Sequence, residues 1–308
     1  MEKTILTFLL FLPLVGSFVI ASLPKESQQG PRIAAIFISI LLCLVSSVAA
    51  FNFDPSVPGM QFESAVKWFD KPFPIEYHVG VDGMSLCLVL LTSFVTLMAV
   101  LASQKVGQTR PKLYYSMIML LTTSIMGVFL SLDLLQFFIL FELELVPMYF
   151  LIAIWGGPNR DYAAMKFLLY TFFGGALMLS GILLLGFQLW QGNVEPHTFN
   201  MIELAKQTPL LMKQWQSAAC LLFLLAFIIK LPSFPSHTWL PDAHVEAPTP
   251  VSMILAALLL KMGSYGLVRI CLTFFPTVIA DWGPLLVLLG AFNIVWAAVA
   301  CLIQSDMK

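Results

Sequence analysis

Long apolar runs, separated by short polar segments, constrain this chain more than any other feature. A helix needs about 20 mostly apolar residues to cross the hydrocarbon of a bilayer. Nine such runs can be read, at 4–23, 33–52, 84–103, 113–132, 134–155, 164–190, 216–235, 249–273 and 283–304. The strands of a transmembrane barrel alternate in polarity over much shorter segments. The sequence therefore predicts an all-α membrane protein with about nine transmembrane helices.

The composition supports this fold class and excludes several others. Hydrophobic residues make up 59% of the 308 residues and charged residues 11%, whereas soluble domains are about half apolar and about a quarter charged. A soluble enzyme, a disordered chain and a disulfide scaffold are therefore excluded. The net charge of −1 gives no basic surface for nucleic acid. The five cysteines lie far apart, without the paired spacing of a metal or redox site.

Nothing in the chain reads as a separate soluble domain, so we treat 1–308 as one integral membrane domain. Two longer polar connections lie at 53–83 and 191–215. The first contains Asp54-Pro55, Pro58-Gly59 and the proline-rich segment 71–74, which predict turns.

Basic residues predict the orientation in the membrane. Short loops on the inner side carry an excess of Lys and Arg, whereas long loops count for less. The short loops after the first, third and fifth runs carry most of the basic residues, so the N-terminus is predicted on the outer (positive) side. These residues are Lys25, Arg32, Lys105, Arg110, Lys112, Arg160 and Lys166, with Lys308 on the same side, and the long connections hold Lys67, Lys71, Lys206 and Lys213.

Two acidic residues lie inside the fifth run, where an ionisable side chain costs several kcal/mol and needs a reason. Glu142 and Glu144 are flanked by apolar residues on both sides. On a regular helix they point about 200° apart, so we expect only one of them to face the charged interior. We expect Glu142 to face the charged interior. Glu144 is expected to find a separate partner or to lie at the membrane interface. Pro147 is expected to kink the helix just beyond the pair.

Lys230 ends the seventh run, and Pro232, Pro235 and Pro241 follow it closely. A regular helix cannot hold three prolines in this spacing. Irregular backbone is tolerated at membrane depth where it is buried in protein or lines a wet cavity. The pattern predicts a broken helix with Lys230 as an ion or proton site, and the alternative is a lysine whose head group reaches the interface.

Lys261 lies in the middle of the eighth run, from which reaching the interface is difficult. Gly263 and Gly266 would let a neighbouring helix come close. His237 and His244 lie in the break, with Asp242 and Glu246 beside them.

Histidines in such a break can pass protons or cap the broken helix. Pro241 lies between His237 and His244 and disturbs the spacing of a helical metal site, so no metal is expected. Together, Glu142, Lys230, His244 and Lys261 could form a chain of titratable groups at mid-membrane that change protonation as a unit.

Three segments carry a resemblance to a known family. They are 141–149 (FELELVPMY), 230–244 (KLPSFPSHTWLPDAH) and 259–263 (LLKMG). They resemble the antiporter-like membrane subunits of respiratory complex I and NAD(P)H–quinone oxidoreductases, of the subunit 4 (chain M) type. The resemblance extends over essentially the whole chain.

The resemblance implies two inverted repeats of five helices, each with a broken helix. Helices one to three would occupy 1–110, the first repeat 111–273 with a broken seventh helix, and helix nine with the start of the next 274–308. It also implies that Glu142 pairs with Lys230, that Lys261 is the central lysine of the eighth helix, and that His237 and His244 belong to the proton relay. Quinone, flavin and iron–sulfur clusters are expected in partner subunits, and this chain is expected to hold no cofactor.

Two departures from the family pattern stand out. Phe141 occupies a position where the family often has tryptophan. Family members also run to about fourteen helices, so we expect this chain to be truncated at the start of the second repeat. A separate chain could carry that repeat.

The favoured function is that of a proton-translocating membrane-arm subunit, driven by electron transfer from NADH, NAD(P)H or ferredoxin to quinone in partner subunits. Its expected surroundings are other membrane-arm subunits and the lipid of a bacterial inner, mitochondrial inner or thylakoid membrane. The alternatives are a subunit of an Mrp-type Na⁺/H⁺ antiporter or membrane-bound hydrogenase, and a structural remnant that conducts no protons.

Overall fold

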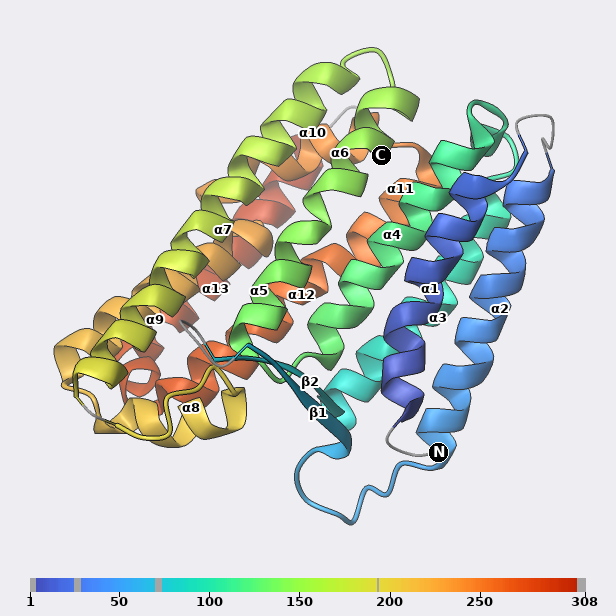
Figure 1. Cartoon of the computed structure of the whole chain (residues 1–308). Helices are drawn as coiled ribbons and strands as arrows, with labels where there is room; N and C mark the ends of the chain where they lie inside the picture. Colours follow the sequence, from blue (N-terminus) through green and yellow to red (C-terminus); the bar gives the residue numbers. More distant parts are fainter. Residues whose placement is uncertain (1–3, 25–28, 70–73, 193, 304–308) are drawn as a thin grey trace.

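The computed structural model describes residues 4–24, 29–69, 74–192 and 194–303. Lys25, most of the expected turn at 71–74 and the polar end 304–308 with Lys308 lie outside the described residues. Long helices run side by side as a bundle, and a two-stranded hairpin lies across one end of it (Figure 1).

In chain order the elements are α1 (Ile5–Ser22), α2 (Gly30–Phe51), β1 (Gln61–Phe69), β2 (Ile75–Val81), α3 (Gly83–Ala102), η2 (Val106–Gln108), α4 (Pro111–Leu130), α5 (Leu134–Leu143), α6 (Leu145–Trp155), α7 (Arg160–Gln191), α8 (Met201–Gln207), η3 (Thr208–Leu210), α9 (Lys213–Lys230), η4 (Ser236–Thr238), α10 (Trp239–Glu246), α11 (Thr249–Ile254), η5 (Leu255–Leu259), α12 (Leu260–Gly266), η6 (Leu267–Leu272) and α13 (Pro276–Ile303).

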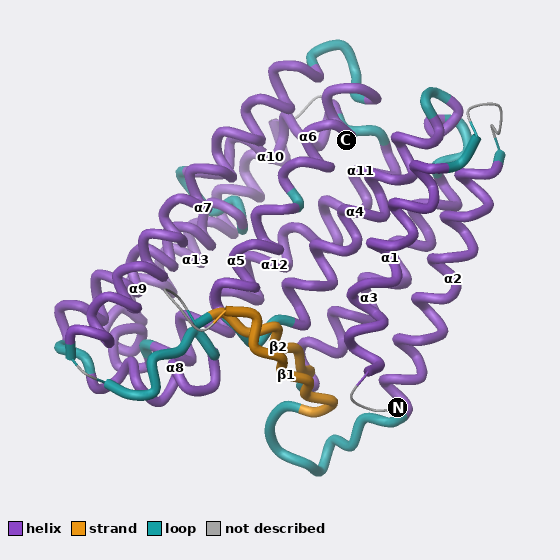
Figure 2. Tube along the Cα trace, in the orientation of Figure 1, coloured by secondary structure: helices purple, strands orange, loops and turns teal. Residues whose placement is uncertain are grey.

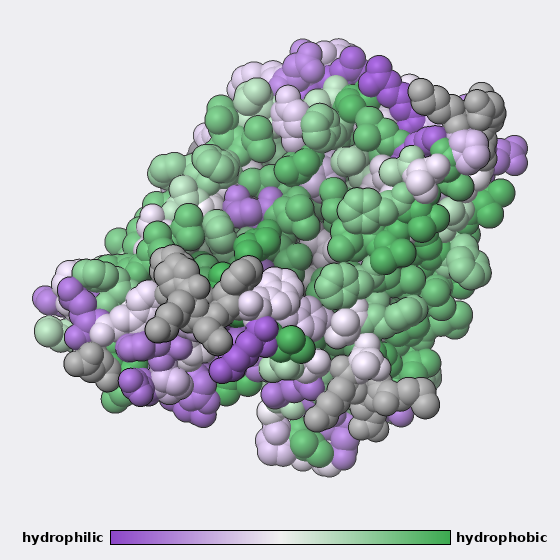
Figure 3. Space-filling view, viewed as in Figure 1, coloured by the Kyte–Doolittle hydropathy of each residue, from purple (hydrophilic) through white to green (hydrophobic). Residues whose placement is uncertain are grey.

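The prediction of an all-α membrane protein is confirmed. Eight helical segments of the described chain are long and apolar enough to cross a membrane: α1, α2, α3, α4, α5 with α6, α7, α11 through η6, and α13. The remaining expected run, 216–235, corresponds to α9, which ends at Lys230 where the prolines begin. The space-filling view shows a broad hydrophobic band between two more hydrophilic ends (Figure 3).

Helix α4 forms the centre of one half of the bundle, and most of its residues are buried. It packs against α1, α3 and α5, while α7 packs against α6, α9 and α10. Helix α13 lies at the edge, with almost all of its apolar length exposed. Apolar side chains on an outer face are what the hydrocarbon of a bilayer requires.

Part of the polar connection at 53–83, where turns were expected, forms a hairpin. Strands β1 and β2 pair antiparallel, and every β2 residue from Tyr77 to Val81 is buried against the helix ends. We call the end of the bundle that carries this hairpin and α8 the hairpin face (Figure 2). The other end, which carries α10 and the turn between α6 and α7, is the opposite face.

Aspartates fix the starts of two helices at the hairpin face. Asp82 accepts a hydrogen bond from the backbone N–H of Ser85 and caps α3. Asp133 accepts hydrogen bonds from the N–H groups of Leu135 and Gln136 and caps α5. Each cap satisfies backbone donors that a helix start leaves unpaired.

Three of the nine expected membrane helices are irregular. The fifth is interrupted at Glu144, between α5 and α6. The seventh breaks after Lys230 and resumes as η4 and α10. The eighth, expected as one regular run at 249–273, contains two π-helical stretches, η5 and η6. Wide turns of this kind are rare and are found often at functional sites.

Candidate functional site

The site is built around a buried ion pair between the fifth and seventh helices. Lys230 ends α9, and its side chain is 2% exposed. Its ammonium Nζ contacts Oε1 of Glu144, whose side chain is 0% exposed. A charge at this depth is costly without an opposite charge beside it. The pair therefore explains why both side chains can be ionised inside the protein.

The contacting carboxylate is that of Glu144, and this corrects the choice made from the sequence. Glu142 was expected to face the charged interior and Glu144 to lie elsewhere. Glu142 is half-buried, and its Oε1 is buried with no hydrogen-bond partner among the described residues. Its carboxylate packs against Gly175 of α7, where a Cβ atom would overlap it. Glu142 is still near enough to Lys230 for their charges to interact.

Pro147 explains the difference. It has no N–H to donate to the carbonyl of Leu143, one helical turn earlier. The helix is interrupted at Glu144, within the acidic segment rather than beyond it. The angle of about 200° between Glu142 and Glu144 holds only for a regular helix. The proline was thus the sequence signal that pointed to Glu144.

Aromatic rings surround the ammonium group. Nζ of Lys230 lies 5.1 Å from the ring centre of Phe141 and 5.7 Å from that of Phe167. Both rings are buried. A cation near an aromatic face is attracted to it, and more strongly where water is excluded. The rings therefore stabilise the charged lysine while keeping its surroundings dry.

The predicted broken helix is confirmed, and its freed backbone groups are satisfied by protein. The indole N–H of Trp239 donates to the carbonyl of Ile229 over 2.9 Å. The N–H of Phe234 donates to Oδ1 of Asn293 on α13 over 2.7 Å, and Nδ2 of Asn293 donates to the Ser233 hydroxyl over 2.6 Å. Such partners make irregular backbone tolerable at membrane depth.

The two histidines lie on the segment after the break. Nε2 of His237 accepts a hydrogen bond from the indole N–H of Trp296 over 3.3 Å, and its Nδ1 is buried without a hydrogen-bond partner among the described residues. Nδ1 of His244 lies 2.6 Å from the hydroxyl of Ser252 on α11. Each histidine thus has its own neighbour, an indole on α13 for His237 and a hydroxyl on α11 for His244.

Lys261 is not brought into the ion pair. Its side chain is exposed, and its ammonium group donates to the carbonyl of Ala256 over 3.3 Å. The close approach predicted for its neighbour Gly263 is confirmed. A Cβ atom there would lie 3.0 Å from the backbone nitrogen of Leu231 and 3.1 Å from the carbonyl oxygen of Phe227. Helix α12 thus packs directly on the end of α9, while Lys261 projects from another side.

An ion pair that the sequence does not predict joins α10, the continuation of the broken helix, to α7. Nζ of Lys166 lies 2.6 Å from Oδ2 of Asp242, with side chains 19% and 39% exposed. Nearby, Oε2 of Glu246 accepts from the N–H of Asn159 over 3.0 Å. These contacts join residues 76 and 87 positions apart in the chain, and no local pattern signals them.

No group of three or more His, Cys, Asp or Glu side chains in the described ranges is placed to hold a metal ion. The site offers paired and single titratable groups instead. Such groups can hold, release and pass protons.

Two family profiles match the chain and together cover nearly all of it. The profile described as "NADH:quinone oxidoreductase/Mrp antiporter, TM" matches residues 131–308. The profile described as "NADH-ubiquinone oxidoreductase chain 4, amino terminus" matches residues 9–132.

Curated relatives agree with these profiles. The chain is 40% identical over 306 residues to "NAD(P)H-quinone oxidoreductase chain 4" of Gloeobacter violaceus, covering 98% of this chain and 56% of the relative. It is 36% identical over 318 aligned positions to "NADH-quinone oxidoreductase subunit M" of Rickettsia conorii, covering 100% of this chain and 62% of the relative. The chain therefore spans little more than half the length of these relatives.

Solved structures show the same fold. A chain of "Respiratory complex I from Thermus thermophilus with bound NADH" superposes with a TM-score of 0.77 at 26% identity, covering 93% of this chain and 57% of that one. A chain of the archaeal membrane-bound sulfane sulfur reductase superposes with a TM-score of 0.82 over 98% of this chain and 60% of that one. Its identity is 20%, so that likeness concerns the fold alone.

Proposed function

The chain belongs to the family of NADH:quinone oxidoreductase and Mrp antiporter transmembrane proteins, and we propose that it is a proton-translocating membrane-arm subunit of a complex I-type NAD(P)H–quinone oxidoreductase. Electron transfer from NADH, NAD(P)H or ferredoxin to quinone takes place in partner subunits, which hold the flavin and the iron–sulfur clusters. This chain contributes proton movement. The names of the relatives support this assignment.

The buried pair of Lys230 and Glu144 is the single observation that carries the proposal. Each charge stabilises the other in a site that excludes water. Taking a proton from the lysine or giving one to the glutamate removes one charge and leaves its partner unpaired. A small displacement at the two helix breaks therefore changes which group holds the proton. Electron transfer in partner chains would supply that displacement.

The relay extends from this pair to the other titratable groups. Glu142 stands beside the pair as a second carboxylate. His237 and His244 lie on the segment that leads from the break toward the opposite face. Lys261 is the exposed end of the relay within the described chain, from which a neighbouring subunit or a further repeat would receive the proton.

The orientation follows the basic residues. Lys105, Arg110 and Arg160 lie at the opposite face, in the turns that precede α4 and at the start of α7. The rule that basic loops stay inside then places that face inside and the hairpin face with the N-terminus outside. The membrane is a bacterial inner, mitochondrial inner or thylakoid membrane.

Purification through a tag on this chain, in mild detergent, tests the assignment by naming its partners with mass spectrometry. We expect membrane-arm subunits, iron–sulfur subunits and quinone-binding subunits in the same particle. A companion chain carrying a second repeat would also be found this way. Small Mrp-type membrane chains without redox subunits would instead identify a cation/proton antiporter, and transport would then depend on Na⁺.

A single substitution distinguishes a proton pump from a chain that only supports assembly. Lys230→Met removes the ammonium group and keeps the length of the side chain. If the chain only supports assembly, the complex with Lys230→Met pumps protons normally. The proposal predicts an assembled complex with greatly reduced pumping.

A further inference from the structure

A second ion pair, partly buried, lies at the hairpin face, away from Lys230. Arg269 is on the π-helical stretch η6, and its side chain is 12% exposed. Its Nη2 lies 2.7 Å from Oδ2 of Asp82, the residue that caps α3. The other oxygen of Asp82 accepts from the N–H of Ser85 over 2.9 Å. Asp82 thus holds the guanidinium with one oxygen and the start of α3 with the other.

Tyr265 fixes the guanidinium on its other side. Nε of Arg269 donates to the hydroxyl oxygen of Tyr265 over 3.1 Å, and the guanidinium carbon lies 5.2 Å from the ring centre. The Tyr265 hydroxyl donates in turn to the carbonyl of Phe129 over 3.3 Å. Arg269 is therefore held between α3, α4 and the eighth helix, in one orientation.

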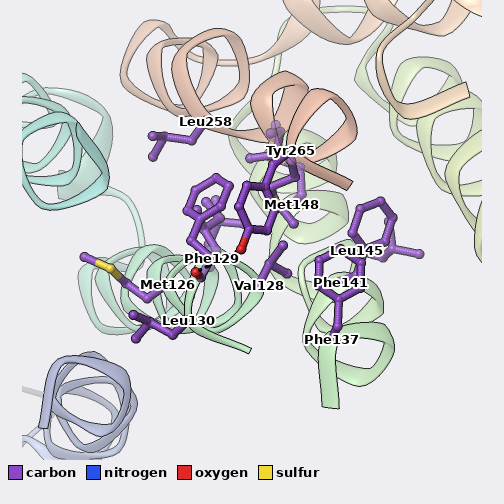
Figure 4. Packing of buried hydrophobic residues seen from close by; sticks show 14 of the residues in the cluster. Met126, Val128, Phe129, Leu130, Phe137, Phe141, Leu145, Met148, Leu258 and Tyr265 are labelled. Atoms are coloured by element: carbon purple, nitrogen blue, oxygen red, sulfur yellow. Dashed lines mark hydrogen bonds between the residues drawn. The ribbon is translucent and has the colours of Figure 1, made fainter. Parts of the chain in front are cut away.

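A line of four aromatic side chains, Phe141, Phe137, Tyr265 and Phe129, lies between this pair and Lys230, and Figure 4 labels these rings. Phe141 lies against the Lys230 ammonium group, and the rings of Phe141 and Phe137 have centres 5.8 Å apart. The ring of Phe137 is followed by that of Tyr265 at 6.5 Å, and Phe129 packs edge-on to Tyr265 at 5.3 Å. All four rings are buried. The two ion pairs thus stand at the two ends of a packed aromatic partition.

We propose that Asp82, Arg269 and Tyr265 form a barrier at the hairpin face that keeps protons from reaching the Lys230 site from that side. Arginine stays charged at any physiological pH. A guanidinium held in one place and partly buried repels protons, as arginines do in selective membrane pores. Asp82 and Tyr265 are positioning residues, because they hold the guanidinium at the mouth of the partition. This role rests on the proposed function, since a barrier has a purpose only where Lys230 handles protons.

Passive proton leak tests the barrier. The intact complex is reconstituted into vesicles, a pH gradient is imposed without electron donor, and its decay is followed with a pH-sensitive dye. Arg269→Gln and Asp82→Asn should speed the decay severalfold, because the guanidinium is removed or released. Arg269→Lys keeps a positive charge and should leak much less than Arg269→Gln.

Two further variants separate the barrier from simple structural damage. Ser85→Ala weakens the start of α3 but leaves the contact between Asp82 and Arg269, so its leak should equal that of the parent. Adding Lys230→Met to Asp82→Asn should abolish the extra leak, because the proton then meets no titratable lysine beyond the partition.

Parental leak in assembled Arg269→Gln and Asp82→Asn complexes would overturn the barrier. So would a leak that persists in the double variant, or one that Ser85→Ala reproduces. If Asp82→Asn and Arg269→Gln fail to assemble while Ser85→Ala assembles, the ion pair is a folding contact. That result would also overturn the barrier. The proposed function fails on a different readout, namely normal donor-driven pumping in Lys230→Met.

Discussion

The ammonium group of Lys230, the last residue of α9, contacts the carboxylate of Glu144, the residue that interrupts the fifth membrane helix. Both partners therefore lie at a break in a helix. Backbone at such a break has fewer helical hydrogen bonds to lose, so the two charges can separate without unwinding a regular helix. In the proposed function, this arrangement would couple the protonation of the Lys230–Glu144 pair to a small movement of two helices.

The side chains of Glu142 and Lys261 should be needed for proton pumping but not for assembly of the complex. Lys261→Ala removes an exposed ammonium group, and Glu142→Gln removes a carboxylate that makes no ion-pair contact within the described ranges. We expect both variants to assemble and to show reduced electron flow and reduced proton pumping. Proton uptake by vesicles and quinone reduction measure the two effects. Normal rates of pumping in both variants would contradict their place in the relay.

Gly263→Ala should disturb the packing of α12 on the end of α9. The added Cβ atom would meet backbone atoms of Leu231 and Phe227 at 3.0 and 3.1 Å, and these atoms cannot move aside as a flexible side chain can. Overpacking of this kind costs about 1–3 kcal/mol. We expect a lower denaturation temperature of the complex and reduced pumping.

Gly290→Ala on α13 is the matched control, because a Cβ atom there meets nothing within 4 Å. Alanine favours a helix over glycine by about 1 kcal/mol, so this variant should be neutral or slightly more stable. Equal losses in the two variants would show that the contact at Gly263 has no special effect.

Asp242→Asn should loosen the broken helix from α7. It removes the carboxylate that pairs with Lys166 over 2.6 Å, and it leaves the size of the side chain almost unchanged. Half-exposed pairs contribute about 1 kcal/mol or less, so the complex should assemble. Hydrogen exchange of residues 239–246 should become faster. The control is Glu203→Gln, which breaks the exposed pair with Lys206 and should leave exchange in 239–246 unchanged. Equal effects of both substitutions would contradict the anchoring role.

The buried carboxyl of Asp133, at the hairpin face, should make the thermal stability of the complex depend on pH. Burial raises the pKa of Asp133 from 3.8 to about 6, although hydrogen bonds from the N–H groups of Gln136, Glu76 and Leu135 lower it in part. A carboxyl whose pKa is raised on folding favours the folded state while it is protonated. Its contribution is complete below about pH 4 and is lost as the pH rises through about 6.

Asp133→Asn keeps an oxygen that can cap α5 but cannot ionise. The denaturation temperature of the parent complex should therefore fall between about pH 4 and pH 7 by more than that of Asp133→Asn. Parallel curves for the two proteins would show that Asp133 does not titrate in this window.

The membrane helices were predictable because one physical requirement governs them. A bilayer demands about 20 apolar residues per crossing, and this signal is local in the sequence. The break after Lys230 was predictable for the same reason, since Pro232, Pro235 and Pro241 act on their own backbone. The hairpin of β1 and β2 was missed because its strands are stabilised by pairing with each other and by burial of β2 on the helix ends.

The site was predictable in its residue types more than in its contacts. Lys230 was identified because a buried charge beside prolines is rare. Glu142 was chosen over Glu144 because the angle of about 200° between them was taken from an unbroken helix, and the helix is broken at Glu144. The pairs Lys166–Asp242 and Asp82–Arg269 join residues 76 and 187 positions apart. Only the packing of the bundle brings such residues together, so no spacing in the sequence marks them.

Exchange of the two charges tests the central claim most directly. In the assembled complex, Lys230→Glu puts a second carboxylate beside Glu144, and Glu144→Lys puts a second ammonium beside Lys230. We predict that each single substitution abolishes donor-driven proton pumping in vesicles. The double variant, Lys230→Glu with Glu144→Lys, should recover a clear part of it because the ion pair is restored in reverse. Normal pumping in either single variant would contradict the account, and so would recovery only when Lys230→Glu is combined with Glu142→Lys.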